Sequence, residues 1–336
     1  MENFQSFSQN KQLLKDIEEN IPKLKEEFEK LKDLRKLEVS DPNFNAAITS
    51  FYILFQFIPL QAPQFSENMR VFRARPNDNK NILYENVSDI SYRTFNPQKI
   101  RVGRFNQPGQ AMFYSTLQVE DNDYDASFVA CMETCKGLSD IKNPIKIKDM
   151  TIGRWRVKSP FFVIVWCFDE EHLKTNKIVK AQADEYINFL KGSLSSNAST
   201  FIIEFLTYFS EMAGTKALSK NDYYILTAMI YALRYYYKKL KNEDIYGLIY
   251  PSAMIEKKGL SLVLTPEAVD QFLTPEKVLM YRFIRSDQNM IGDYCSNMVD
   301  VIDDKFNITG FRPVADNAWY TNECENDTGE PLKQSK

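Results

Sequence analysis

The sequence predicts an α+β fold, and three observations lead to that prediction. Residues 10–37 carry apolar side chains at helical spacing, residues 71–168 contain short β-like stretches between turn-forming residues, and residues 180–240 return to a helical pattern. The chain has 336 residues, of which 44% are hydrophobic, so it can bury a core of its own. We therefore expect helices and strands in one or two domains.

The first helical segment carries an apolar stripe whose members lie three or four residues apart. They are Leu14, Ile17, Ile21, Leu24, Phe28 and Leu31. Because Pro22 interrupts the segment, we expect either a kink near Ile21 or two short helices. Three heptads are a short run for an intermolecular coiled coil, so we expect the stripe to pack on its own domain. A contact surface for self-association is the alternative.

Further elements follow from the same patterns. The apolar segment 44–60 predicts a buried helix that ends at Pro59. Short strands are expected in VFRARP (71–76), AMFYST (111–116) and PFFVIVWCF (160–168). The segments 201–212 and 223–240 carry large residues around much of the helix circumference, which is typical of core helices.

Two Thr-Pro-Glu tripeptides indicate helix starts near the end of the chain. In Thr265-Pro266-Glu267 and Thr274-Pro275-Glu276, the Thr would cap, the Pro would take the first helical position and the Glu would favour the helix dipole. We expect a short helix to begin at each. The tail beyond residue 320 is polar enough to predict disorder.

Composition excludes several partners. The net charge of −3 comes from 42 basic and 45 acidic residues, so we expect no direct binding of nucleic acid. The longest apolar run, residues 51–60, is too short to cross a membrane. Five scattered cysteines and a polar start, without a secretory leader, favour a reducing cytoplasm.

The residues and motifs present exclude several kinds of catalytic and binding site. A single histidine, His172, rules out a two-histidine zinc site, and we expect it at the surface. Cys131 and Cys135 lack a second pair at metal spacing and are expected to be core residues, so no metal is predicted. Neither a Walker loop nor a G-x-G-x-x-G motif is present. Phosphate binding would therefore rest on arginines.

Four segments carry the functional prediction. In chain order they are VFRARP (71–76), VGRFNQPGQAMFYST (102–116), ASFVACME (126–133) and YGLIYPSAM (246–254). Together they resemble the RES-domain family, which is named for its Arg, Glu and Ser. The resemblance covers about residues 70–285. Two departures are Phe105, where the family usually has Trp, and the inserted acidic stretch EDNDYD before Glu133.

The resemblance implies a fold and a division of the chain. RES domains resemble ADP-ribosyltransferases, with a mixed β core, and this chain looks like a long variant with extra helical segments. We expect an N-terminal helical extension at 1–66, a RES domain at 67–285 with the helical block 180–240 inside it, and a C-terminal extension at 286–336.

The resemblance also implies a site for NAD⁺ as substrate. Arg73 and Arg104 suit its pyrophosphate, because a guanidinium pairs bidentately with phosphate oxygens. Arg75 shares a strand face with Arg73 and could assist or replace it. Asn106, beside Arg104, is carried over as a binding residue. Tyr114 could stack on the nicotinamide or adenine ring.

Two further residues complete the expected site. Glu133 would be a carboxylate on a largely buried helix, where it could stabilise the cationic ribose as nicotinamide leaves. Ser252 is carried over as a binding residue and not a nucleophile, because no histidine stands ready to activate it. We expect Glu133, Arg73 and Tyr114 to serve catalysis, and all these side chains to converge on one cleft.

The expected function is cleavage of the nicotinamide–ribose bond of NAD⁺ by water or phosphate. One alternative is mono-ADP-ribosylation of a protein, and another is a non-catalytic interaction protein that uses the stripe 14–31. Many RES toxins are paired with a small DNA-binding antitoxin, so such a partner is an expectation here too, as is homo-oligomer formation.

Overall fold

The structure is a computed structural model, which describes residues 11–77, 83–93, 96–118, 125–138, 147–216, 218–255, 257–286 and 289–311. About 48% of the chain is helix and 22% is strand, so the predicted α+β class is confirmed. Within the described residues, every helix is too short or too polar to span a membrane. Residues 120–124 of the acidic stretch EDNDYD and the tail beyond residue 320 lie outside the described residues, whereas Asp125, the last residue of that stretch, is described.

The chain forms two compact units, and neither follows the chain continuously. The helical unit contains Met1–Gln64, Val102–Gln107 and Phe161–Ala253. The sheet unit contains Phe65–Arg101, Pro108–Pro160 and Met254–Lys336. Each unit therefore gathers three segments, whereas the division expected from the sequence follows chain order.

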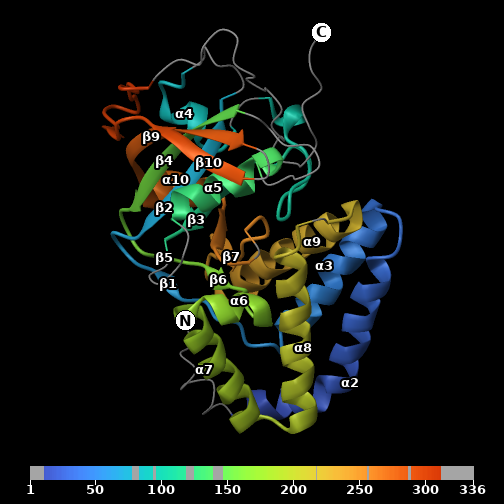
Figure 1. Cartoon of the computed structure of the whole chain (residues 1–336). Helices are drawn as coiled ribbons and strands as arrows, with labels where there is room; N and C mark the ends of the chain where they lie inside the picture. Colours follow the sequence, from blue (N-terminus) through green and yellow to red (C-terminus); the bar gives the residue numbers. More distant parts are fainter. Residues whose placement is uncertain are drawn as a thin grey trace. The chain divides into compact units, whose positions relative to one another are not determined.

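The helical unit consists mainly of long helices (Figure 1). Its helices are α2 (Lys11–Leu34), α3 (Asp41–Phe55), α6 (Glu170–Thr175), α7 (Lys177–Ser193), α8 (Ser196–Ala213) and α9 (Lys220–Tyr236), which continues as a π-helical turn, η3 (Tyr237–Lys241). Its strands are β5 (Phe161–Phe162), β6 (Ile164–Val165) and β7 (Gly247–Pro251), and β6 pairs in parallel with β7.

The apolar stripe of α2 packs inside this unit, as predicted. Its buried members are Ile17, Ile21, Leu24, Phe28 and Leu31. The ring of Phe28 meets the ring of Phe205 of α8 edge to face, with centroids 5.5 Å apart. The expectation of two short helices is wrong, because α2 continues through Pro22. Pro22 lies on the exposed side of α2, where its missing N–H disturbs one backbone bond and none of the buried stripe.

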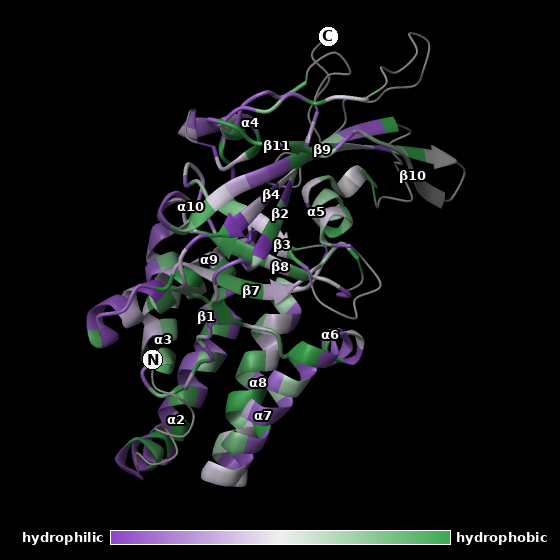
Figure 2. Cartoon of the chain, turned by 90° about the vertical axis from the view of Figure 1, so that its left-hand side faces the viewer, coloured by the Kyte–Doolittle hydropathy of each residue, from purple (hydrophilic) through white to green (hydrophobic). Residues whose placement is uncertain are grey.

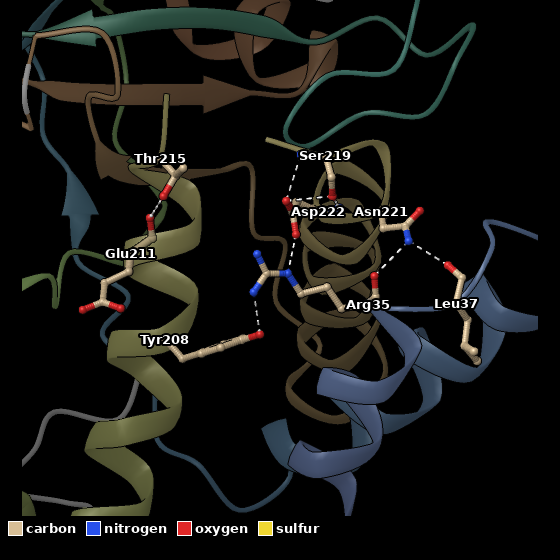
Figure 3. Close-up of polar contacts among 8 residues, drawn as sticks. All are labelled: Arg35, Leu37, Tyr208, Glu211, Thr215, Ser219, Asn221 and Asp222. Carbon is tan, nitrogen blue, oxygen red and sulfur yellow. Dashed lines mark hydrogen bonds and ion pairs between the residues drawn. The ribbon is translucent and has the colours of Figure 1, made fainter. Parts of the chain in front are cut away.

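A polar clasp fastens the end of α2 to α8 and α9 (Figure 3). The Arg35 guanidinium donates to the Asp222 carboxylate and, through Nη1, to the Tyr208 hydroxyl at 2.9 Å. The Asn221 amide donates to the carbonyl oxygens of Arg35 (2.9 Å) and Leu37 (2.8 Å). These bonds satisfy carbonyl groups that a helix end leaves without partners.

The remaining helices follow the sequence closely, with one exception. Both α8 and α9 are largely buried, as predicted, and α3 ends at Phe55, four residues before Pro59. The exception is His172 in α6, which was expected at the surface and is 0% exposed. A short polar sequence around it favoured exposure, but α6 packs this residue into the helical unit.

The sheet unit is built on antiparallel strands, in the order β10-β9-β4-β2-β3-β8, with β11 beside β9. Its strands are β2 (Arg70–Pro76), β3 (Phe113–Leu117), β4 (Ile147–Val157), β8 (Leu260–Leu264), β9 (Leu273–Ser286), β10 (Asn289–Cys295) and β11 (Val299–Asp300); β1 (Gln64–Phe65) lies at the unit boundary. Its helices are α4 (Val87–Ile90), η1 (Pro97–Lys99), α5 (Ala126–Thr134), η2 (Lys136–Leu138) and α10 (Pro266–Phe272).

Helix α5 covers one face of this sheet, and the core lies between them. The core cluster includes Ala74 of β2, Ile152 of β4 and Val129 of α5. Cys131 and Cys135 belong to the same cluster, which confirms that they are core residues. Strand β8 is hydrophobic along most of its length, as Figure 2 shows. This pattern is expected for strands with covered faces.

The two Thr-Pro-Glu signals have different outcomes. Thr265 caps α10 as predicted, and its hydroxyl accepts a hydrogen bond from the Ala268 N–H at 3.3 Å. The helix expected at Thr274 is wrong, because residues 273–286 form β9. Pro275 pairs with Trp155 where the β4–β9 register shifts, and such an irregularity tolerates its missing N–H. The Arg154 guanidinium also binds the Glu276 carboxylate at 2.9 Å, which favours the strand.

Candidate functional site

The residues predicted to form the site divide between the two units. Arg73, Arg75, Tyr114 and Glu133 belong to the sheet unit. Arg104, Asn106 and Ser252 belong to the helical unit. The expectation of a single cleft concerns residues of both units and stays a prediction.

Arg73 is held tightly within the sheet unit. It is 3% exposed on β2, and its Nε and Nη1 donate to the carbonyl oxygens of Ile90 (3.2 Å) and Tyr114 (2.7 Å). Its guanidinium also lies over the Phe113 ring, 5.2 Å from the centroid. Through these bonds, Arg73 links the predicted segment 71–76 to the main chain of the predicted segment 102–116.

The strand register separates the side chains of Arg73 and Tyr114. Phe72 lies opposite Thr116 in the antiparallel β2–β3 pair, so these two share a sheet face. Tyr114 is on the same face as Thr116, because residues two apart on a strand point the same way. Arg73 therefore points to the other face. Arg75 shares the face of Arg73; its side chain is partly exposed and makes no hydrogen bond or ion pair with other described residues.

Gly153 makes room for the group that surrounds Arg73. It lies directly opposite Arg73 on β4. A Cβ atom there would come within 2.5 Å of the Trp155 ring and 2.9 Å of Ile90 Cδ1. The Trp155 ring packs edge-on against the Phe113 ring, with centroids 4.9 Å apart. Gly153 was not among the residues predicted from the sequence, although a glycine inside a strand can signal close packing.

Tyr114 and Glu133 share the α5 face of the sheet. The Thr116 hydroxyl donates to the Ala126 carbonyl at the start of α5 (2.6 Å), which identifies that face. At the other end of α5, the Thr134 hydroxyl donates to the carbonyl of Ala74 (3.4 Å). Ala74 lies two residues after Phe72 and so belongs to this same face of β2. Glu133, next to Thr134, therefore lies at the end of α5 that reaches Ala74, on the side of the sheet to which Tyr114 points.

The Glu133 carboxylate has a defined partner that the sequence analysis missed. Its Oε1 accepts a hydrogen bond from the Met254 main-chain N–H at 2.8 Å. Met254 ends the segment YGLIYPSAM, so the resemblance could have drawn attention to it. The bond orients a partly buried carboxylate, which can accept from several donors at once.

In the helical unit, Arg104 lies in a tight turn that spans Gly103–Asn106. The Gly103 N–H donates to the Asn106 carbonyl at 3.1 Å and closes the turn. The Arg104 Nη1 donates to the carbonyl of Ala213, the last residue of α8, at 2.9 Å. The partial negative charge of a helix C-terminus stabilises a cation there.

Arg104 has unused binding capacity. It is 7% exposed, and it forms no ion pair with any carboxylate in the described part of the chain. A buried charge without a counter-ion is costly, and a guanidinium has five N–H donors. The helix end offsets only part of that cost. An anion such as phosphate would complete the surroundings of Arg104.

The remaining predicted residues of the helical unit are buried. The Asn106 amide donates to the Gln107 carbonyl at 3.0 Å. Phe105 packs edge-on against the Tyr250 ring, with centroids 4.9 Å apart. Ser252 directly follows β7 and is 0% exposed.

Within the described residues, no group of three or more His, Cys, Asp or Glu side chains is placed to hold a metal ion. A small pocket in the helical unit, open to solvent, is lined by residues of α3 and α9, among them Phe44 and Tyr224, and by none of the predicted site residues.

Compared with known proteins, the chain matches no family model and no curated protein. The resemblance to RES domains stays a prediction from the four sequence segments.

Proposed function

We propose that this chain binds NAD⁺ and cleaves its nicotinamide–ribose bond, as its resemblance to RES domains implies. The observation that carries the proposal is the Glu133 carboxylate. It is oriented by the Met254 N–H at 2.8 Å, on the sheet face that also presents Tyr114. The predicted segments 126–133 and 246–254 thus contact each other at Glu133, the residue to which we assign the chemistry.

The proposed reaction needs one well-placed negative charge. The bond from ribose C1 to the nicotinamide nitrogen breaks, its electron pair stays on nitrogen, and nicotinamide leaves as a neutral molecule. The ribose becomes an oxocarbenium-like cation, which the Glu133 carboxylate stabilises. Water then bonds to C1 and loses a proton to give ADP-ribose. Phosphate as acceptor would give the corresponding sugar phosphate.

The other residues receive binding and positioning roles. Arg104, assisted by Asn106, binds pyrophosphate oxygens, and Tyr114 stacks on a ring of NAD⁺. Ser252 hydrogen-bonds a ribose or phosphate oxygen, and Arg75 can pair with a phosphate. Arg73 holds the β2–β3 main chain, because its guanidinium is buried and bonded to carbonyl oxygens. This role replaces the pyrophosphate contact expected from the sequence.

The test is nicotinamide release by the purified protein. Glu133→Gln keeps an oxygen that can accept the Met254 N–H but removes the charge, so we expect turnover to fall about 10²–10³-fold. The matched control is Glu67→Gln, which makes the same change at an exposed residue of the sheet unit and should leave turnover unchanged. Equal rates for wild type and Glu133→Gln would reject the assignment, and a wild type that releases no nicotinamide would reject the function.

The alternatives separate in the same experiment. Transfer of ADP-ribose to a protein uses the same NAD⁺ contacts, and labelled NAD⁺ incubated with lysate would then leave label on a protein band. The interaction-protein alternative is weakened, because the stripe it needs is buried inside the helical unit. A small DNA-binding antitoxin partner stays a prediction.

A further inference from the structure

The short segment Val102–Gln107 is attached to a different unit from its neighbours in the chain. Residues 65–101 and 108–160 belong to the sheet unit, whereas Val102–Gln107 belongs to the helical unit. This segment contains Arg104 and Asn106, the proposed pyrophosphate ligands. Its attachment therefore bears directly on how the NAD⁺ contacts are held in place.

Two helices of the helical unit hold this segment. The end of α8 receives the Arg104 side chain through the Ala213 carbonyl. In the middle of α9, the Thr227 hydroxyl lies 3.5 Å from the carbonyl oxygens of both Gly103 and Asn106. These two carbonyls mark the start and the end of the turn.

The direction of the Thr227 hydroxyl is informative. A threonine inside a helix usually bonds back to a carbonyl of the preceding turn of the same helix. Thr227 is 0% exposed, and its contacts in the described part of the chain are with the turn Gly103–Asn106 instead. Because a hydroxyl has one proton, the Thr227 hydroxyl donates either to one of these carbonyl oxygens at a time or to both in a bifurcated hydrogen bond.

Helix α9 is itself anchored at its start. Ser219 and Asp222 form a capping box, and the Asp222 carboxylate also receives the Arg35 guanidinium from the end of α2 (Figure 3). Arg35 in turn donates to Tyr208 of α8. The clasp therefore connects α2, α8 and α9, and the last two of these helices hold the turn.

We propose that the helical unit positions the NAD⁺-binding turn Gly103–Asn106, with Thr227 as a positioning residue. The inference rests on the proposed function, since it assigns a purpose to the helices that extend this chain. In this proposal, the amino-terminal helices and the 180–240 block hold the substrate-binding turn Gly103–Asn106 in position.

The experiment compares three variants of the full chain. Thr227→Val is nearly isosteric and removes the hydroxyl, whereas Thr227→Ser retains it. The matched control is Thr207→Val in α8, which also removes a hydroxyl bonded to a carbonyl, that of Phe168 at 3.4 Å, but away from the turn. The readouts are hydrogen exchange of a peptide covering residues 102–107, KM and kcat for NAD⁺, and urea unfolding.

Positioning predicts a specific pattern. Thr227→Val should raise KM for NAD⁺ about two- to tenfold, the range for one lost hydrogen bond, with kcat changed less. Exchange at residues 102–107 should become faster. Thr227→Ser should restore both quantities, and Thr207→Val should alter neither, even if both valine variants unfold at lower urea.

The outcomes separate this inference from the proposed function. Unchanged exchange at 102–107 in Thr227→Val would overturn the positioning role, as would equal changes of KM in Thr227→Val and Thr207→Val. A wild type that neither binds nor cleaves NAD⁺ would overturn the proposed function and this inference with it. Faster exchange would then show a structural bond only.

Discussion

The helical unit and the sheet unit differ in how they present their predicted functional residues. In the helical unit, Arg104, Asn106 and Ser252 are buried. In the sheet unit, Tyr114 and Glu133 are partly exposed on the α5 face. Partly exposed side chains can contact a substrate directly, whereas buried side chains are held in position by the elements around them. In the proposed function, the reactive groups come from the sheet unit and the pyrophosphate-binding groups from the helical unit.

The two units also differ in what stabilises them. The helical unit has a core of aromatic rings in edge contacts, among them Phe28, Phe51, Phe205 and Phe209. The sheet unit has backbone ladders and a buried ion pair, in which Arg282 binds both carboxylate oxygens of Asp149 at 2.8 and 2.9 Å. Side-chain volume should therefore matter more in the first unit and local backbone geometry more in the second.

The largest effect on stability is expected at Phe28. Phe28→Ala leaves a cavity among several rings of the helical unit, so unfolding should cost about 3–5 kcal/mol less than in the wild type. Denaturant unfolding followed by fluorescence measures this, with Trp166 reporting on the helical unit and Trp155 on the sheet unit. Phe28→Leu, which fills most of the space, should lose much less. A loss below about 1 kcal/mol for the alanine variant would show that the ring core is not decisive.

Replacing a glycine by alanine should change the free energy of unfolding by a smaller amount, and the sign of the change should differ between the two units. Gly153→Ala forces a methyl group against Trp155 and Ile90, so the sheet unit should lose about 1–3 kcal/mol, with altered Trp155 fluorescence. Gly192→Ala in α7 meets no atom within 4 Å and should stabilise the helical unit by up to about 1 kcal/mol. Urea unfolding of both variants gives the two signs. A neutral Gly153→Ala would mean that the Trp155 packing around Arg73 adapts easily.

The smallest change in the free energy of unfolding is expected on loss of the Arg35–Asp222 ion pair of the clasp, and this change should depend on pH. Burial alone would raise the pKa of Asp222, but hydrogen bonds from Arg35 and Ser219 and the charge of Arg35 outweigh it and lower that pKa. A lowered pKa in the folded state contributes stability above the unfolded value of about 3.9, and this contribution disappears as pH falls through the folded pKa.

The measurement is the free energy of unfolding between neutral pH and pH 2. Asp222→Asn should lose up to about 1 kcal/mol at neutral pH, because Arg35 is partly exposed, and the difference from wild type should shrink in acid. Asp33→Asn, which alters an exposed ion pair of α2, serves as the control with little change at any pH. A difference that grows as pH falls would contradict the lowered pKa.

Local patterns determined much of the fold and part of the candidate site. The stripe of α2, the cap at Thr265, the strand with Arg73 and the helix with Glu133 all depend on residues a few positions apart. Periodicity and capping are properties of such short ranges, so the sequence predicts them well. The type of these elements needed no tertiary information.

Only the tertiary structure decided how distant residues combine. Thr274-Pro275-Glu276 has a helix-start pattern, yet the ladder to β4 makes it a strand. His172 has polar neighbours, yet it is buried. The register of β2 against β3 directs Arg73 and Tyr114 to opposite faces, and Thr227 meets a turn more than 120 positions away. Strand pairing, burial and side-chain partners are set by contacts between distant segments, whose energies exceed local preferences.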